Sequence, residues 1–456
     1  MRIIIVGNGK VGSTLAEQLS GEDHDVVIID KNQQNVDNSV NSLDVMGICG
    51  NGASYRVLLE ADVSRADLLI ACTSQDEINL LCCLVAKKLG AKHTIARVRN
   101  PEYSDQLVFM RDELGLSMSI NPEKAAASEL FHLLKFPSAI KIESFSNNRV
   151  EIAELKLREG SPLDRVYLRD LHKLFKAKAL ICAVQRGTEV IIPDGNFMLH
   201  ARDKISVIAP ARDMLDFFAF LGTILPEARN VMIVGGGRIS FYLARMLLDN
   251  GAKVKITDVD PDRCAELGQL LPRAMVICGD GTDPELLNEE GIKDMDALVA
   301  LTGLDEENII LGIYAQSCIS GKVIAKVNRP TLTAIAESTG LESIISPRAL
   351  TANLIVRYVR SMQNTLGSNV ETLHRLVGGA VEALEFRVNR TFPMLDVPLK
   401  DITLKPNILI ASISRGGKTI IPGGRDVISE GDRVIIVTTN RRFDDLSEIL
   451  QRGHTI

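Results

Sequence analysis

The chain has 456 residues, 46% of them hydrophobic and 24% charged, which is the composition of a folded globular protein rather than a disordered one. Its 52 basic residues are scattered among 58 acidic ones, so neither a nucleic-acid-binding face nor a polybasic membrane anchor is expected. No run approaches the roughly 20 apolar residues of a transmembrane helix, and residues 3–6 resemble a strand rather than a signal peptide. We therefore expect an intracellular protein with no transmembrane segment of its own.

Cysteine and histidine usage predicts neither disulfides nor a metal site. The eight cysteines form no Cys-x-x-Cys pair and lie in apolar contexts, which is typical of reduced core thiols. The adjacent Cys82 and Cys83 leave a redox site open as an alternative. The seven histidines do not cluster, so no metal is expected.

The chain contains the same pattern twice. Gly7 and Gly235, like Asp30 and Asp258, are 228 residues apart. Further matched pairs are 229 apart: Asp67 and Asp296, Asp76 and Asp305, Asn79 and Asn308, Pro101 and Pro330. So long a period indicates duplication of at least a whole domain, not a solenoid repeat.

Short apolar runs alternate with helical segments in each copy. In the first copy the predicted strands are Arg2–Val6, Asp25–Ile29, Val45–Cys49, Leu68–Cys72, His93–Val98 and Ser117–Ile120. In the second they are Asn230–Val234, Lys253–Thr257, Val276–Cys278, Ala297–Leu301, Val323–Val327 and Ser343–Ile345. Because the runs are continuously apolar, they predict parallel sheets buried on both faces, which is an α/β fold.

A helical connector follows each α/β unit, at Pro122–Lys135 and Pro347–Leu366. Short strands and glycine turns come next, with matched Ile-Pro segments at 192–195 and 421–424 and matched Asp203 and Asp432. These predict two small α+β domains. The expected order is two Rossmann-like domains at 1–138 and 227–366, each followed by a small domain, at 139–226 and 367–456.

The strand before residue 7 leads into Gly7-Asn8-Gly9-Lys10-Val11-Gly12, a Gly-x-Gly-x-x-Gly pattern at the start of a helix. This pattern lets backbone amides approach a phosphate. The second copy has Gly235-Gly236-Gly237-Arg238-Ile239-Ser240, in which Ser240 replaces the third glycine. Loops kept without a ligand, especially the second one, remain the alternative.

Asp30 and Asp258 end the second strand of each copy, where a carboxylate accepts hydrogen bonds from ribose hydroxyls. Their charge favours NAD over NADP, whereas ATP and ADP share the same adenosine and stay open. A carboxylate that only caps the next helix is the structural alternative.

Cations follow the second glycine at Lys10 and Arg238, and lie after the fifth strand at Arg97, Arg99 and Lys326. Asn328 is the residue of the second copy that corresponds to Arg99. The first site is therefore expected to offer three cations and the second site two. Solvated surface charges are the alternative for each of these residues.

The fourth strands end in Thr73-Ser74 and Thr302-Gly303, at the edge where open α/β sheets bind ligands. We expect these four residues near the nucleotide. The Asp-Glu-x-Asn segments that follow, at 76–79 and 305–308, are expected to be structural.

No catalytic apparatus accompanies these sites. His172, His200 and His374 do not correspond between the copies, and neither an ATP-hydrolysis loop nor a Gly-x-Ser-x-Gly turn is present. Nucleotide binding without catalysis indicates a sensor, not an enzyme. An NAD-dependent oxidoreductase and a scaffold with vestigial sites are the competing interpretations.

Taken together, these motifs resemble the TrkA family, the tandem-RCK (regulator of potassium conductance) subunits of bacterial Trk potassium-uptake systems. The resemblance covers the whole chain and is carried by the two glycine loops with Asp30 and Asp258 and by segments 49–52, 76–79, 278–281 and 305–308. It implies a homotetramer, peripheral on the cytoplasmic face of the inner membrane, that binds NAD(H) or ATP/ADP and regulates an integral-membrane potassium channel subunit. The nucleotide contacts expected in addition to those above are Asn8, Val11, Val98, Ile239, Asp280 and Gly281.

Overall fold

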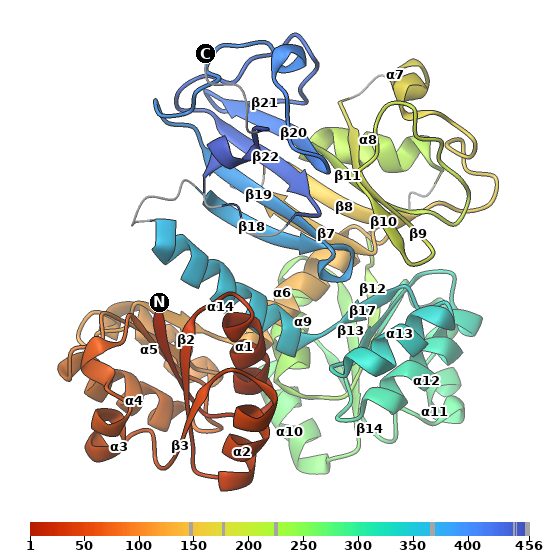
Figure 1. Cartoon of the computed structure of the whole chain (residues 1–456). Coiled ribbons are helices and arrows are strands. Elements are labelled where there is room, and N and C mark those ends of the chain that lie inside the picture. The colour runs from red at the N-terminus through yellow and green to blue at the C-terminus, as the bar shows by residue number, and fades with distance from the viewer. Residues whose placement is uncertain are drawn as a thin grey trace. The chain divides into compact units, whose positions relative to one another are not determined.

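The computed structural model describes residues 1–145, 149–175, 178–222, 227–364, 370–440, 443 and 445–451 (Figure 1). The chain forms two compact units, each built from two separate stretches. Unit 1 comprises Met1–Phe131 with Arg229–Val356, and unit 2 comprises His132–Ala228 with Arg357–Ile456. Corresponding parts of the two copies therefore belong to the same unit. The predicted boundaries at 226 and 366 lie outside the described residues, and the four predicted domain ranges stay a prediction.

The first part of unit 1 is a six-stranded parallel sheet in the order β3-β2-β1-β4-β5-β6, which is the Rossmann order. Its strands are β1 (Arg2–Val6), β2 (Asp25–Asp30), β3 (Met46–Cys49), β4 (Leu68–Ala71), β5 (His93–Arg97) and β6 (Met118–Ile120). Its helices are α1 (Lys10–Ser20), α2 (Gln33–Ser42), α3 (Tyr55–Glu60), α4 (Asp76–Lys88), α5 (Pro101–Met110) and α6 (Pro122–Lys135), with the 3-10 turn η1 (Val63–Arg65). The end of α6, from His132 on, belongs to unit 2.

The second part repeats this sheet in the order β14-β13-β12-β15-β16-β17. Its strands are β12 (Asn230–Val234), β13 (Lys253–Asp258), β14 (Met275–Cys278), β15 (Ala297–Ala300), β16 (Lys322–Lys326) and β17 (Ser343–Ile345). Its helices are α9 (Arg238–Asp249), α10 (Pro261–Leu270), α11 (Pro284–Glu289), α12 (Asp305–Cys318), α13 (Pro330–Ser338) and α14 (Pro347–Asn364), with η3 (Ile292–Asp294). The end of α14, from Arg357 on, belongs to unit 2. The predicted strands of both copies are confirmed, with ends that differ by no more than one residue. The last two residues predicted for the second connector, 365 and 366, are outside the described residues.

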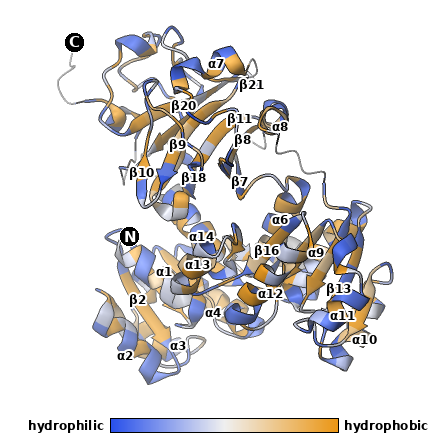
Figure 2. Ribbon diagram, turned by 90° about the vertical axis from the view of Figure 1, so that its right-hand side faces the viewer, coloured by the Kyte–Doolittle hydropathy of each residue, from blue (hydrophilic) through white to orange (hydrophobic). Residues whose placement is uncertain are grey.

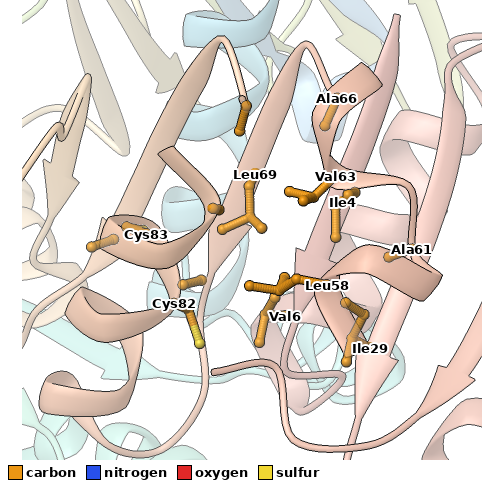
Figure 3. Close-up of a cluster of buried hydrophobic side chains, with 14 of the residues drawn as sticks. Ile4, Val6, Ile29, Leu58, Ala61, Val63, Ala66, Leu69, Cys82 and Cys83 are labelled. Atoms are coloured by element: carbon orange, nitrogen blue, oxygen red, sulfur yellow. The ribbon is translucent and has the colours of Figure 1, made fainter. Parts of the chain in front are cut away.

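Both faces of the strands are buried, as the apolar runs predicted. In β1, Ile3, Ile4 and Ile5 are all fully inaccessible to solvent, and hydrophobic residues concentrate on the strands (Figure 2). Ile4 packs with Leu58 of α3 and Leu69 of β4 on one face (Figure 3). Because both faces of the sheet are buried, polar groups are found at the ends of the strands. In open α/β sheets, ligands bind at the carboxyl ends.

Unit 2 holds two five-stranded antiparallel sheets. The first has the order β10-β9-β11-β8-β7, with β7 (Lys141–Phe145), β8 (Val150–Lys156), β9 (Leu180–Arg186), β10 (Glu189–Ile191), β11 (Lys204–Pro210), the helices α7 (Leu171–Leu174) and α8 (Ala211–Phe220), and η2 (Leu168–Asp170). The second has the order β18-β19-β22-β20-β21, with β18 (Val370–Leu376), β19 (Val381–Arg387), β20 (Ile408–Arg415), β21 (Lys418–Ile420), β22 (Arg433–Thr438) and the 3-10 turns η4 (Val377–Gly379), η5 (Leu399–Asp401) and η6 (Leu446–Ile449). The predicted fold class, two parallel-sheet domains each followed by a small α+β domain, is confirmed.

The repeated aspartates of the small domains have the same structural role. Asp203 accepts two hydrogen bonds from Arg186, both 2.8 Å long, and Asp432 accepts the equivalent pair from Arg415 at 2.8 and 2.7 Å. Both aspartates are about 98% buried, so each bidentate pair neutralises a charge that would otherwise be costly to bury.

Among the described residues, no helix combines the length and the apolar character needed to span a bilayer.

Candidate nucleotide-binding site

A pocket of about 460 Å³ opens at the carboxyl ends of the first Rossmann sheet, next to the switch point between β1 and β4. This volume is within the usual range for a small-molecule site. Eight of the residues predicted for the first site line it: Gly7, Gly9, Lys10, Val11, Asp30, Thr73, Ser74 and Arg97. Strands and loops from across the first half of the chain therefore meet at one place.

The glycine loop forms as its pattern predicts. Gly7 has φ +95° and donates its N–H to the Ile29 carbonyl at 2.8 Å; a side chain there would press on the Thr73 backbone at 2.8 Å. Gly9 is the N-cap of α1 and, as a glycine, has no side chain that could cap the helix. A Cβ at Gly9 would meet no atom within 4 Å. The start of α1 thus faces open space, which suits a phosphate at a helix N-terminus.

Asp30 holds the loop as well as facing the pocket. Its Oδ2 accepts the Asn8 N–H at 2.6 Å, and its Oδ1 accepts the Asn32 N–H at 2.8 Å. The Asn35 side chain also donates to Oδ1, at 3.5 Å. A carboxylate has about four acceptor positions, so Asp30 can still accept a hydrogen bond from a ribose hydroxyl. The structural and the ligand-binding interpretations of Asp30 are therefore compatible.

Three residues that were predicted to contact the nucleotide at the first site have side chains outside the pocket. The Asn8 side chain donates to Asn35 O at 2.6 Å and to Ser39 Oγ at 2.8 Å, so only its backbone faces the loop. Val98 is 1% exposed and belongs to the core. Arg99 is absent from the pocket lining; its guanidinium hydrogen-bonds to the Ser74 carbonyl and lies 3.6 Å from Asp76.

The cations near the phosphate end are therefore Lys10, which is exposed, and Arg97, which is half-buried. Arg97 hydrogen-bonds to the Thr73 carbonyl. Burial lowers the pKa of Arg97, which stays far above neutral for any arginine. Both residues are charged donors at the pocket wall.

Asp76 and Asn79 are structural, as predicted. Asn79 is fully buried and joins two strand ends: its Oδ1 accepts the Thr73 N–H at 2.8 Å, and its Nδ2 donates to Arg97 O at 2.8 Å. Asp76 Oδ2 accepts the N–H groups of Arg99 and Asn100, both at 2.8 Å. Asp305 and Asn308 make the matching contacts in the second copy.

Sequence reasoning missed part of the pocket wall. Gly50, Asn51 and Gly52 after β3 line it, together with Lys31, Asn35, Gln75 and Ile78. A usable signal existed, because Asp280 and Gly281 were predicted for the second copy and their counterparts are Asn51 and Gly52.

The second glycine loop keeps the same geometry. Gly235 has φ +98°, and Gly236 donates its N–H to Asp258 Oδ2 at 2.6 Å, the same length as in the first copy. Asp258 Oδ1 accepts the Asp260 N–H at 2.9 Å. Arg263 of α10, the counterpart of Asn35, donates its Nε–H to the Gly236 carbonyl at 2.6 Å and forms an ion pair with Glu266.

Ser240 is accommodated by a compensating exchange. In the first copy a Cβ at Gly12 would lie 1.9 Å from the Gly7 carbonyl oxygen, which accepts the Cys72 thiol at 3.2 Å. In the second copy the hydroxyl of Ser240 donates to the equivalent carbonyl of Gly235, and Leu301 stands where Cys72 does. A hydroxyl from the helix thus replaces a thiol from the strand.

The remaining predicted residues of the second site surround this loop. Arg238 and Gly237 are exposed at the start of α9, and Ile239 is half-buried. Gly303 is exposed and Thr302 half-buried. Asp280 accepts the N–H and hydroxyl of Thr282 at 2.9 and 2.7 Å, and Gly281 lies so close to β12 and β13 that a Cβ would meet Val234 at 2.5 Å. The binding of a nucleotide by these residues stays a prediction.

Charged side chains of the two copies affect each other's pKa within unit 1. Burial lowers the pKa of Lys326, Asp305 raises it, and the ammonium group of Lys10 lowers it further. Burial raises the pKa of Glu123, and Arg99, Arg97 and Arg238 oppose that effect. Cations of each copy therefore act on the carboxyl-end edge of the other.

Cys82 and Cys83 belong to α4 and are fully buried on the side of this helix that packs into the core (Figure 3). Burial raises the pKa of Cys82 to about 12 and also raises that of Cys83. Neither thiol has the exposure and thiolate character of a redox site, so the core interpretation is confirmed for this pair. It is wrong for Cys49 and Cys278, which are exposed at strand ends. No group of three or more metal-ligating side chains occurs among the residues that the structure describes.

Known protein families match the chain twice each, in agreement with its duplication. The TrkA-N domain family matches residues 3–122 and 231–347, and the TrkA-C domain family matches residues 152–222 and 383–451. The Trk system potassium uptake protein TrkA homolog 1 of Methanosarcina mazei is 35% identical over 444 residues, 96% of this chain and 97% of that protein. The Trk system potassium uptake protein TrkA homolog of Archaeoglobus fulgidus is 34% identical over 451 residues, 99% of this chain and all of that protein.

Solved structures share the fold. The GsuK channel bound to NAD superposes with a TM-score of 0.63 at 18% identity, covering 96% of this chain and 76% of that one. The GsuK structure bound to ADP gives a TM-score of 0.50 at 16% identity, covering 79% of this chain and 69% of that one. The duplicated domains, the family matches and the full-length relatives together show that the chain belongs to the TrkA family of Trk system potassium uptake proteins.

Proposed function

We propose that this chain is the nucleotide-sensing regulatory subunit of a Trk-type potassium-uptake system. In this function it binds NAD(H), or ATP and ADP, at the glycine loops of unit 1. It acts as a homotetramer on an integral-membrane potassium channel subunit, from the cytoplasmic face of the inner membrane. The observation that carries the proposal is the first pocket, in which the open N-terminus of α1, Asp30, Lys10 and Arg97 converge.

The chemistry of the pocket supports binding rather than catalysis. Its titratable side chains in the described part of the chain are Lys10, Asp30, Lys31, Cys72 and Arg97. Burial raises the pKa of Cys72 to about 12, which leaves it protonated, and Asp30 already holds two backbone N–H groups. A hydride-transfer enzyme needs an acid-base group aimed at the nicotinamide, and none of these side chains is suited to that task. The oxidoreductase alternative is accordingly not supported.

NAD(H) and ATP or ADP share the adenosine that Asp30 would hold, so the two ligand classes differ at the phosphate end. That end holds Arg97 and Lys10, and the charge of Lys10 acts on Lys326 of the second copy. A ligand that changes the charge there would change the balance between the two halves of unit 1. Regulation also requires different affinities in two states, typically about 1–3 kcal/mol per coupled site.

The test is calorimetric titration of the whole chain with NADH, NAD, ATP and ADP. Asp30→Asn and Asp258→Asn are preferable to alanine variants, because the amide oxygen can still accept the Asn8 or Gly236 N–H. We expect each variant to lose at least about tenfold in affinity at its own site only, because charged hydrogen bonds to the ribose are lost. Asp37→Asn, the same change at an exposed position of α2, serves as the matched control.

Potassium flux through the channel subunit in liposomes distinguishes a sensor from a scaffold. A sensor carrying Asp30→Asn should support flux that no longer responds to the nucleotide. Wild-type and Asp30→Asn chains with the same nucleotide response would refute sensing at the first site.

A further inference from the structure

We propose that Cys264 and Cys278, beside the second glycine loop, form a thiol pair that hydroperoxides or small disulfides oxidise reversibly to a disulfide, and that this weakens nucleotide binding at the second site. The first half of the proposal stands on geometry alone. The second half rests on the proposed nucleotide binding at Asp258.

Helix α10 places Cys264 over the end of two strands. Its thiol lies 3.4 Å from the Asp258 carbonyl oxygen of β13 and 3.8 Å from the Ile277 carbonyl oxygen of β14. Cys278 is the last residue of β14, in register with Asp258. Because the Ile277 carbonyl belongs to the peptide unit that joins Ile277 to Cys278, the Cys264 thiol lies against the backbone of Cys278. The two thiols and the carbonyl of the ribose-binding aspartate therefore form one cluster.

The two thiols differ in access. Cys278 is exposed, at the end of the edge strand β14, whereas Cys264 is 9% exposed. Burial, the Cys278 thiol and Asp258 raise the pKa of Cys264 to about 11. Cys278 is therefore the thiol that meets an oxidant first, and Cys264 is the resolving thiol.

The chemistry closes without a further reactant. The Cys278 thiolate attacks one oxygen of a hydroperoxide and breaks the O–O bond. Cys278 becomes a sulfenic acid, and the other oxygen leaves as an alcohol or water. The Cys264 sulfur then attacks that sulfur, forming the S–S bond and releasing water. With a small disulfide as oxidant, Cys278 first forms a mixed disulfide, and Cys264 displaces the small thiol. A dithiol reductant reverses either route.

The first copy is a natural contrast. Cys49 ends β3 in register with Asp30, as Cys278 does with Asp258. The position of Cys264 is occupied by Val36, which is 3% exposed. The pair therefore exists only in the second copy, and Cys49 provides an exposed thiol without a resolving neighbour.

The pair is connected to the second site through α10 and β13. The Cys264 thiol donates to the carbonyl of Asp258, whose carboxylate holds the Gly236 N–H. Disulfide formation removes that donor and ties the first turn of α10 to the strand end that leads into the loop with Asp280. We expect affinity at the second site to fall by about threefold or more, on the scale of one lost hydrogen bond.

The deciding experiment is peptide mapping of the full chain after hydrogen peroxide or diamide, with alkylation of remaining thiols in denaturant. We expect a peptide pair joined through Cys264 and Cys278 that a dithiol reductant separates. Cys264→Val, which copies the first half, and Cys278→Ser should each abolish it, while Cys49 yields no intrachain partner. Oxidation of Cys278 with Cys264 fully alkylated would overturn the thiol pair.

A second arm measures nucleotide affinity in an Asp30→Asn background, in which the second site is read alone. Oxidation should weaken binding, and Cys264→Val should remove the response to oxidant. A crosslink with unchanged affinity would overturn the regulatory half. If the reduced chain binds no nucleotide at this site, the proposed function of the second copy fails, whereas the mapping result still decides the thiol pair.

Discussion

At the scale of single residues, the two glycine loops show how one fold tolerates different sequences. The carbonyl of the first loop glycine needs a donor, and it takes one either from Cys72 or from Ser240. In the first copy, Gly12 leaves room for the Cys72 thiol. In the second copy, the Ser240 hydroxyl takes the place of that thiol as the donor. The apparent departure of the second copy from the glycine pattern is thus one half of an exchange.

The exchange predicts opposite outcomes for two glycines of the first loop. In Gly12→Ala the new Cβ would lie 1.9 Å from the Gly7 carbonyl oxygen, and we expect a loss of about 1–3 kcal/mol in stability from overpacking. Gly9→Ala meets no protein atom within 4 Å, so the fold should be kept while the new methyl obstructs the nucleotide. Thermal unfolding and calorimetric titration separate the two effects.

A double variant tests whether the exchange of donors between Cys72 and Ser240 accounts for these effects. Gly12→Ser with Cys72→Leu copies the second loop into the first and should recover most of the stability lost by Gly12→Ser alone. If Gly12→Ala unfolds at the wild-type temperature, or if the double variant shows no recovery, the exchange is not what holds the loop.

At the scale of elements, the start of α4 is tied to two strands by side chains of its first turn. Asn79 joins the ends of β4 and β5, and Asp76 holds the two residues after Val98. The same ties recur at the start of α12. These contacts fix the edge of the sheet where Thr73 and Arg97 face the pocket.

Asn79→Leu keeps a similar side-chain volume but leaves the Thr73 N–H and the Arg97 carbonyl without this partner. We expect a loss of about 2–4 kcal/mol, since buried backbone groups then stay unsatisfied. Circular dichroism in denaturant measures the loss, and amide hydrogen exchange should rise at the start of α4. Lys88→Ala, at an exposed position of the same helix, should change neither quantity, and equal behaviour of the two variants would contradict the role of Asn79.

At the scale of the whole molecule, corresponding parts of the two copies pack together rather than each copy folding alone. In unit 2 the two small domains share one hydrophobic core that includes Phe145, Ile208, Leu376 and Ile435. Beside it, Glu143 of β7 pairs with His374 of β18 and lies 2.7 Å from Lys141. Arg357 is also within hydrogen-bonding distance of His374. A buried polar cluster thus joins the two copies.

This cluster predicts acid sensitivity. Burial raises the pKa of Glu143, but Lys141 and His374 outweigh it and hold that pKa well below its ordinary value. A depressed carboxyl pKa contributes stability above the unfolded-state value of about 4.3, and the contribution is lost as pH falls below about 5. Glu143→Gln should lower stability at neutral pH by about 3 kcal/mol or more and should flatten the dependence below pH 5.

Thermal unfolding between about pH 2 and pH 7.5 measures both effects. Glu430→Gln removes the exposed ion pair with Arg390 and should have little effect, as is usual for surface pairs. Parallel pH profiles of the wild type and Glu143→Gln would refute the role of this carboxyl group.

Much of this could be predicted from the sequence, because the signals are local. Apolar runs such as Arg2–Val6 specify buried parallel strands, and Gly7 and Asp30 lie at the ends of consecutive strands that must meet at one sheet edge. The duplication was visible in the spacing alone. These features determined the fold class, the first pocket and the carboxylate at its rim.

The tertiary structure decided what depends on residues far apart in sequence. Asn8 and Val98 have the right positions along the chain, but packing turns their side chains away from the pocket. The exchange of Cys72 for Ser240, the influence of Lys10 on Lys326, and the position of the Cys264 thiol beside the end of β14 each need distances between separate elements. Sequence periodicity fixes which face a residue occupies, whereas only the packing of helix on strand fixes which side chain it meets.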